Sequence, residues 1–282
     1  MSRVKIVTDS TAYLPPQLCE QYGIEVIPLY VLFGQQTYRD NVDIQPAEFY
    51  QRLQTFKNGL PTTSQPSAGD FQKLYRRLAG ECDAIVSVHI SSVLSGTLAS
   101  AEQARALVPD VPIHLIDSRS TSAGLGYVVL AAARAAAAGA SAEEAAKAAL
   151  ALVPKVRVYF ALETLHYLHM GGRIGGGAAL LGAALGIKPI LEIRDGRIEA
   201  AGKVRSKRKA LEFLVERLVA DFGEGATVRA ATLSAMEPEE AKLVADMLAK
   251  RLNVVESYTV ELSPVLGVHV GPGTVGAVAC PA

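Results

Sequence analysis

The chain has 282 residues, half of them hydrophobic, which is enough for two ordinary domains with apolar cores. Its 28 Lys and Arg residues balance 28 Asp and Glu residues, and Trp is absent. The sequence therefore offers neither the positive field nor the aromatic platforms that nucleic-acid binding uses, and nucleic acid is not an expected partner.

The cysteines and the apolar stretches indicate the compartment. Cys19, Cys82 and Cys280 are far apart and form no Cys-x-x-Cys pair, which favours a reducing environment and no structural metal. Residues 1–5 run into an expected strand rather than a signal sequence, and charged residues interrupt the apolar window 127–153. We expect a cytoplasmic protein that makes at most transient contact with a membrane.

The first half of the chain alternates short apolar runs with helical patterns. Strands are expected at 4–8, 25–33, 84–89 and 113–116, and helices are expected to begin near Pro16, Pro46, Ser67, Leu98 and Ala123. This alternation predicts an α/β domain with a mostly parallel sheet and helices on both faces. In such sheets ligands bind outside the carboxyl ends of the strands.

Two hydroxyl-rich stretches, Pro61–Ser67 and Ser91–Thr97, each precede an expected helix. Free backbone N–H groups at a helix start, together with neutral hydroxyl donors, can bind an anion such as a carboxylate. Ser and Thr at such positions are also the usual N-caps, so each stretch alone allows either interpretation. Asp9-Ser10 and Asp117–Ser122 would lie at the same sheet edge as Ser91–Thr97.

The second half begins after two Ala-rich helices, at 125–138 and 142–152, the latter opened by the capping-box pair Ser141 and Glu144. The chain is expected to cross into a second domain at Pro154. The predicted domains are an N-terminal α/β domain, residues 1–153, and a C-terminal α/β domain, residues 154–282.

Further strands and helices follow in the second half. Strands are expected at 156–162, 187–193, 197–204, 226–234 and 254–261, and helices at 163–170, 207–222 and 238–252. Asp195-Gly196 is a strong hairpin signal and predicts an antiparallel element, hence a mixed sheet. The stretch 263–273 is expected to be a shaped loop.

The sequence lacks the motifs of phosphate-binding loops, dinucleotide sites and metal sites. No glycine run carries the lysine of a phosphate-binding P-loop, and Gly175–Gly177 lacks the context of a dinucleotide fingerprint. His166 and His169 have no third ligand nearby. We therefore expect no metal and no cofactor.

Two further interpretations stay open. Ser95 with His269 as base could form a nucleophilic pair, although the flanks of Ser95 do not match the GxSxG elbow. The basic run 203–209 is either a solvated face or a docking point for an acidic partner or a phosphate.

Six motifs, taken in order, resemble the DegV family, including its fatty acid-binding members of the FakB type. They are Thr8-Asp9-Ser10-Thr11; Thr63-Ser64-Gln65-Pro66-Ser67; Ser91–Thr97; Asp117-Ser118 with Gly124-Leu125-Gly126; Gly171-Gly172-Arg173-Ile174; and Gly267-Val268-His269-Val270-Gly271. The similarity covers nearly the whole chain.

The resemblance implies a long-chain fatty acid in a tunnel between two α/β domains. Thr63 and Ser95 would bind the carboxylate, His269 would assist, and Gly96 would donate through its backbone. The rest of the implied ligand-binding set is Ser64, Thr97 and Arg205, the last in a region linked to carboxylate handling or kinase contact.

FakB-type members are not enzymes themselves. They present the bound acid to a separate fatty acid kinase subunit, which forms the acyl phosphate from ATP for phospholipid synthesis. The resemblance therefore predicts a carrier with no catalytic residue. The alternatives are a serine-dependent lipid hydrolase that uses Ser95 and His269, and a structural or regulatory α/β module that binds a lipid.

Overall fold

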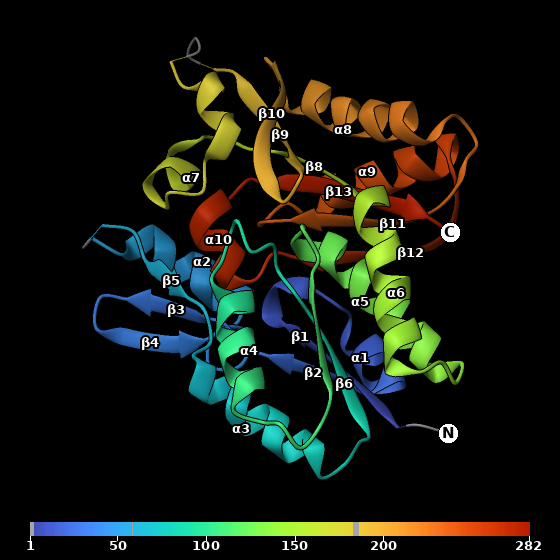
Figure 1. Cartoon of the computed structure of the whole chain (residues 1–282). Helices are drawn as coiled ribbons and strands as arrows, with labels where there is room; N and C mark the ends of the chain where they lie inside the picture. Colours follow the sequence, from blue (N-terminus) through green and yellow to red (C-terminus); the bar gives the residue numbers. More distant parts are fainter. Residues whose placement is uncertain (1–2, 58, 183–185) are drawn as a thin grey trace. The chain divides into compact units, whose positions relative to one another are not determined.

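The computed structural model describes residues 3–57, 59–182 and 186–282, and its contacts divide the chain into two compact units (Figure 1). The first unit is Met1–Tyr30 with Ser64–Pro154, and the second is Val31–Thr63 with Lys155–Ala282. One boundary between the units falls after Pro154. The two contiguous halves, 1–153 and 154–282, do not match, because residues 31–63 make most of their contacts with the second half.

The first unit contains a parallel four-stranded sheet in the order β2-β1-β6-β7. Its strands are β1 (Val4–Asp9), β2 (Ile24–Ile27), β6 (Ala84–His89) and β7 (Ile113–Asp117). The parallel sheet predicted from the alternating pattern is thus confirmed. The single strand predicted at 25–33 is wrong: β2 ends at Ile27, and β3 (Tyr30–Phe33) belongs to another sheet. Pro28 lies between them and has no N–H for a sheet ladder.

Helices cover both faces of this sheet. They are the short η1 (Ser10–Ala12), followed by α1 (Pro16–Tyr22), α3 (Ala68–Ala79), α4 (Thr97–Ala106), α5 (Ser122–Ala137) and α6 (Ala142–Leu152). Phe71 and Tyr75 of α3 pack with residues of α4 against the face that carries Val7 and Ile85. The helices α5 and α6, green in Figure 1, pack on each other and on β1, β6 and β7. Ser141 and Glu144 form the predicted capping box.

The second unit is built on a mixed six-stranded sheet in the order β10-β9-β8-β13-β11-β12. Its strands are β8 (Arg157–Ala161), β9 (Lys188–Arg194), β10 (Arg197–Val204), β11 (Thr227–Ser234), β12 (Asn253–Glu261) and β13 (Val275–Pro281). Only β11 and β12 pair in parallel among the described strand pairs of this sheet. The predicted hairpin is confirmed: Asp195 and Gly196 both have positive φ, at 52° and 80°.

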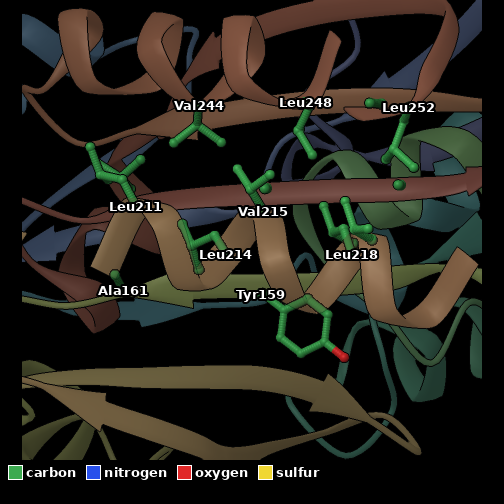
Figure 2. Close-up of a cluster of buried hydrophobic side chains, with 14 of the residues drawn as sticks. Tyr159, Ala161, Leu211, Leu214, Val215, Leu218, Val244, Leu248 and Leu252 are labelled. Carbon is green, nitrogen blue, oxygen red and sulfur yellow. The ribbon is translucent and has the colours of Figure 1, made fainter. Parts of the chain in front are cut away.

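Two long helices, α8 (Lys207–Phe222) and α9 (Pro238–Arg251), cover one face of this sheet. Figure 2 shows side chains of both helices pointing toward one another in a shared cluster. Leu211, Leu214, Val215 and Leu218 come from α8, and Val244 and Leu248 come from α9. Their spacing of three or four positions places them on one face of each helix.

The segment 31–63 adds a small sheet and a helix to the second unit. Its elements are most of β3, then β4 (Gln36–Arg39), α2 (Pro46–Thr55) and most of β5 (Thr62–Ser64), with strand order β4-β3-β5. Short helices in the described part of the unit are α7 (His166–Met170), the 3₁₀ helix η3 (Gly175–Leu180) and α10 (Pro264–Val270), and the 3₁₀ helix η2 (Val153–Lys155) lies at its boundary. The loop predicted at 263–273 is therefore wrong over most of its length. None of the helices in the described ranges is long and apolar enough to cross a membrane.

Candidate functional site

Thr63 and His269, both in the second unit, are joined by a hydrogen bond. Thr63 lies in β5 and His269 lies near the end of α10, and Thr63 Oγ1 is 2.8 Å from His269 Nε2. Both side chains are partly buried. The sequence named both residues as candidates, and the structure brings them together across 206 positions of the chain.

The imidazole of His269 lies in a buried and closely packed position. Its Nδ1 is buried and has no hydrogen-bond partner among the described residues. A Cβ at Gly171 would collide with that nitrogen, so only glycine at 171 allows this approach. Burial first, and then the positive charge of Arg173, lower the pKa of His269 to about 4. At neutral pH the ring is therefore uncharged.

The neutral ring has one N–H, and its position decides what Thr63 can do. If Nδ1 carried the hydrogen, a buried donor would be left without an acceptor, which is costly. The hydrogen on Nε2 leaves only an unpaired acceptor and lets His269 donate to Thr63 Oγ1. The hydroxyl hydrogen of Thr63 is then free to donate to another group.

In the first unit, Ser95 and Thr97 form a second cluster of hydroxyls at the start of α4. Their side-chain oxygens are 2.8 Å apart, and Ser95 Oγ also accepts the N–H of Thr97 at 3.3 Å. Ser95 is partly buried and Thr97 is fully buried. Gly96 between them is the N-cap residue of α4, and the Gln65 side chain packs directly against it. Gly96 has no side chain to cap α4, so the capping interpretation is wrong for this turn, whereas Ser67 in the other stretch does cap α3 by accepting the Asp70 N–H.

The turn that carries Ser95 is tied to the neighbouring strand end. The N–H of Ser91 donates to Ser120 O at 2.8 Å, and Ser92 Oγ donates to Asp117 Oδ2 at 2.5 Å. These residues follow β6 and β7, whose carboxyl ends meet at one edge of the parallel sheet. The predicted meeting of these polar stretches at that edge is confirmed.

A fully buried polar chain lies below this edge. Asp9 Oδ2 accepts from His89 Nδ1 at 3.0 Å and from the Ile90 N–H at 2.9 Å, and His89 Nε2 is 2.7 Å from Ser87 Oγ. Ser87 Oγ in turn is 2.8 Å from the Tyr75 hydroxyl. The order Ser87, His89, Asp9 resembles a hydrolase triad, but all three side chains are completely buried. These hydrogen bonds between buried side chains fix the ends of β1 and β6.

The remaining candidates are exposed. Ser64 Oγ donates to the carbonyl of Gln65 at 3.2 Å. Arg205 lies between β10 and the Ser206 N-cap of α8, with its side chain in solvent. Lys207 of the same basic run is partly buried and donates to Gly273 O at 2.6 Å, which makes it a structural contact.

Two residues outside the predicted site act on members of it. Arg173 lowers the pKa of His269, and Gln65 covers Gly96. Both lie within motifs that carry the family resemblance, so the motifs are the signal that could have found them. Within residues 3–57, 59–182 and 186–282, no group of three or more His, Cys, Asp or Glu side chains could hold a metal ion.

Comparison with known proteins places this geometry in a family. The sequence model described as "Uncharacterised protein, DegV family" matches residues 3–282. The chain belongs to the DegV family. It is 41% identical to a DegV domain-containing protein of Streptomyces coelicolor over 281 residues, covering 99% of both chains.

Two solved structures are similar along nearly the whole chain. A fatty acid-binding DegV family protein from Thermus thermophilus shares 38% identity with a TM-score of 0.94, over 99% of this chain and 100% of that one. A stearic acid-binding protein from Eubacterium ventriosum shares 29% identity with a TM-score of 0.89, over 100% of this chain and 98% of that one.

Proposed function

We propose that this DegV protein binds a long-chain fatty acid, with its carboxylate on the hydroxyls of Thr63 and Ser95 and its acyl chain buried in the protein. The observation that carries the proposal is the bond between Thr63 and a neutral His269. A Thr63 hydroxyl that accepts from His269 has its own hydrogen available for a carboxylate oxygen. Fatty acid binding by similar DegV structures supports the same ligand class.

Ser95 is the second proposed donor. Thr63 precedes Gln65 by two residues, and the Gln65 side chain packs against Gly96, next to Ser95. This sequence connection supports a single ligand for both hydroxyls. Gly96 would contribute its backbone N–H at the start of α4, Thr97 would hold the Ser95 hydroxyl in place through its own N–H and hydroxyl, and Ser64 would contribute a rim hydroxyl.

Affinity would come mainly from the acyl chain. Burial of each CH₂ contributes about 0.8 kcal/mol, or roughly a fourfold change in affinity. A few neutral hydroxyl donors then suffice to orient the acid without making it hard to release. The acid would be taken up and delivered through transient contact with a membrane.

We further propose that the bound acid is presented to a separate kinase, which makes the acyl phosphate from ATP for phospholipid synthesis. The exposed Arg205 at the start of α8 would contact this kinase. In this scheme the protein is a carrier in the cytoplasm and needs no cofactor.

The loaded protein mixed with Mg-ATP alone should give no acyl hydroxamate on trapping with hydroxylamine. Addition of a purified fatty acid kinase subunit should give it, and Arg205→Glu should reduce it.

The geometry of His269 disfavours the alternative, a lipid hydrolase that uses Ser95 and His269. A base for Ser95 would need a free Nε2 and a group that orients Nδ1. In the described structure Nε2 bonds Thr63, and Nδ1 has no partner. Hydrolysis of a long-chain ester that is lost in Ser95→Ala would restore this alternative.

The ligand itself can be tested directly. Denatured protein should release a long-chain acid in about equal molar amount, read by mass spectrometry. For the delipidated protein, Thr63→Ala and Ser95→Ala should each weaken binding of the acid by about tenfold and leave binding of its methyl ester nearly unchanged. If both hydroxyls bind one carboxylate, the double variant should deviate from additivity. Full additivity, or equal losses for acid and ester, would count against the shared site.

A further inference from the structure

The helix that carries His269 has a sequence that does not favour a helix. Within its seven residues, α10 contains a glycine and three valines, and helices this short are unstable in isolation. The side chain of its N-cap residue, Ser263, makes no capping bond to its own helix. Contacts from elsewhere in the fold must therefore hold α10 in place.

The main polar contact comes from Asp40, in the loop between β4 and α2. Asp40 Oδ2 accepts from Ser263 Oγ at 2.9 Å, and Asp40 Oδ1 accepts the N–H of Val265 at 3.1 Å. Asp40 is only 1% exposed, and Ser263 is fully buried. Val265 is the second residue of the helix, so the Asp40 carboxylate takes the place of a capping side chain.

Further contacts fix α10 along its length. Gly267 faces α2 so closely that a Cβ there would lie 2.6 Å from Phe49 Cε1 and 2.9 Å from the Tyr50 hydroxyl. The Tyr50 hydroxyl also donates to Leu262 O at 3.3 Å. The same segment, 31–63, ends in Thr63, which bonds His269. One segment thus supplies both the partner of His269 and several contacts that hold its helix, while α7 also packs on α10.

We propose that Asp40 is a positioning residue for the candidate ligand site, which sets His269 beside Thr63 by capping α10 from a separate element. Asp40 does not touch the ligand in this scheme. Its effect on ligand binding rests on the proposed function, whereas its effect on His269 does not require a ligand.

Three variants separate the hydrogen bonds from the charge. Asp40→Ala removes both bonds. Asp40→Asn keeps both, because the amide oxygen can accept from Val265 and the amide nitrogen can donate to Ser263 Oγ. Ser263→Ala removes the bond to Asp40 Oδ2, keeps the bond from the Val265 N–H to Asp40 Oδ1, and serves if Asp40→Ala does not fold. Ser141→Ala, which removes the capping bond of α6 in the other unit, is the matched control for general loss of stability.

The first measurement uses ligand-free protein. NMR titration of the His269 ring should show its pKa rising toward the ordinary value in Asp40→Ala, because a displaced α10 exposes the ring to water. Asp40→Asn and Ser141→Ala should leave the titration of His269 at its wild-type position. Ser263→Ala should give a shift in the same direction as Asp40→Ala, but smaller.

The second measurement compares binding of palmitic acid and methyl palmitate. Asp40→Ala should weaken binding of the acid by about tenfold and binding of the ester by less than about twofold, because only the acid uses Thr63. Asp40→Asn should stay within about threefold of wild type for the acid.

Two outcomes would overturn the proposal. Asp40→Ala with a lower melting temperature but unchanged His269 titration would make Asp40 a purely structural residue. Asp40→Asn behaving like Asp40→Ala would show that charge, not the capping bonds, is what matters. A wild-type protein that binds no acid refutes the proposed function alone, because the ligand-free titration still decides the role of Asp40.

Discussion

The hydroxyl of Thr63 lies 2.8 Å from Nε2 of His269, on a ring whose other nitrogen is buried without a partner in the described structure. In the described structure, only one of the two ring nitrogens of His269 therefore has a hydrogen-bond partner. Since Thr63 is the one hydrogen-bond partner of the ring there, changes at position 63 test the pair without any ligand.

We expect Thr63→Val to lower the free energy of unfolding by about 1–3 kcal/mol, because Val keeps the shape and leaves a buried N–H of His269 without an acceptor. Thr63→Ser keeps the hydroxyl and should cost less than about 1 kcal/mol. Urea unfolding at pH 7.5 measures both. Equal stability of the Val and Ser variants would mean that the hydrogen bond contributes nothing.

The lowered pKa of His269 predicts a specific dependence of stability on pH. In the unfolded chain His titrates near 6.5, and in the folded protein its pKa is about 4, so between these values only the unfolded state binds the proton. Stability from the neutral ring is complete above about pH 6.5 and falls as the pH drops toward 4, by up to about 3 kcal/mol. Below pH 4 the loss levels off.

The variant His269→Gln isolates this effect. The carboxylates titrate in both proteins, so the difference between their unfolding free energies should shrink from pH 7 to pH 4 and stay constant above pH 7. Curves that run parallel over the whole range would contradict a lowered pKa for His269.

The buried chain at Asp9 should be sensitive to a change of one atom. Asp9→Asn replaces one carboxylate oxygen with a donor, which then faces donors from Thr11 or from His89 and Ile90. We expect a loss of about 2–4 kcal/mol in urea unfolding, because buried donors are left without acceptors. The control Asp117→Asn, at an exposed bond to Ser92, should cost less than about 1 kcal/mol.

A methyl group at Gly267 should disturb α10 by overpacking. The added Cβ would meet Phe49 and Tyr50 at less than van der Waals distance, so Gly267→Ala should cost about 1–3 kcal/mol. Gly69→Ala in α3 meets its nearest neighbour at 3.6 Å and should be neutral or slightly stabilising. If the clash is the cause, Phe49→Leu should recover part of the loss in a double-mutant cycle.

The sequence by itself determined the alternation of strands and helices, the parallel sheet of the first unit, the hairpin at Asp195-Gly196 and the hydroxyl turn around Ser95. These features depend on local periodicity, caps and turn residues, which a single stretch of chain displays. Six motifs in order also predicted the family, which the comparisons confirm.

Only the tertiary structure decided which unit residues 31–63 join and that α10 is a helix. The stretch 264–270 has few helix-favouring residues among a glycine and three valines, and its cap, Asp40, lies 223 positions away from Ser263. The pairing of Thr63 with His269 likewise spans 206 positions. Such contacts follow from packing between distant segments, because no local pattern records which buried carboxylate or hydroxyl will meet a given helix.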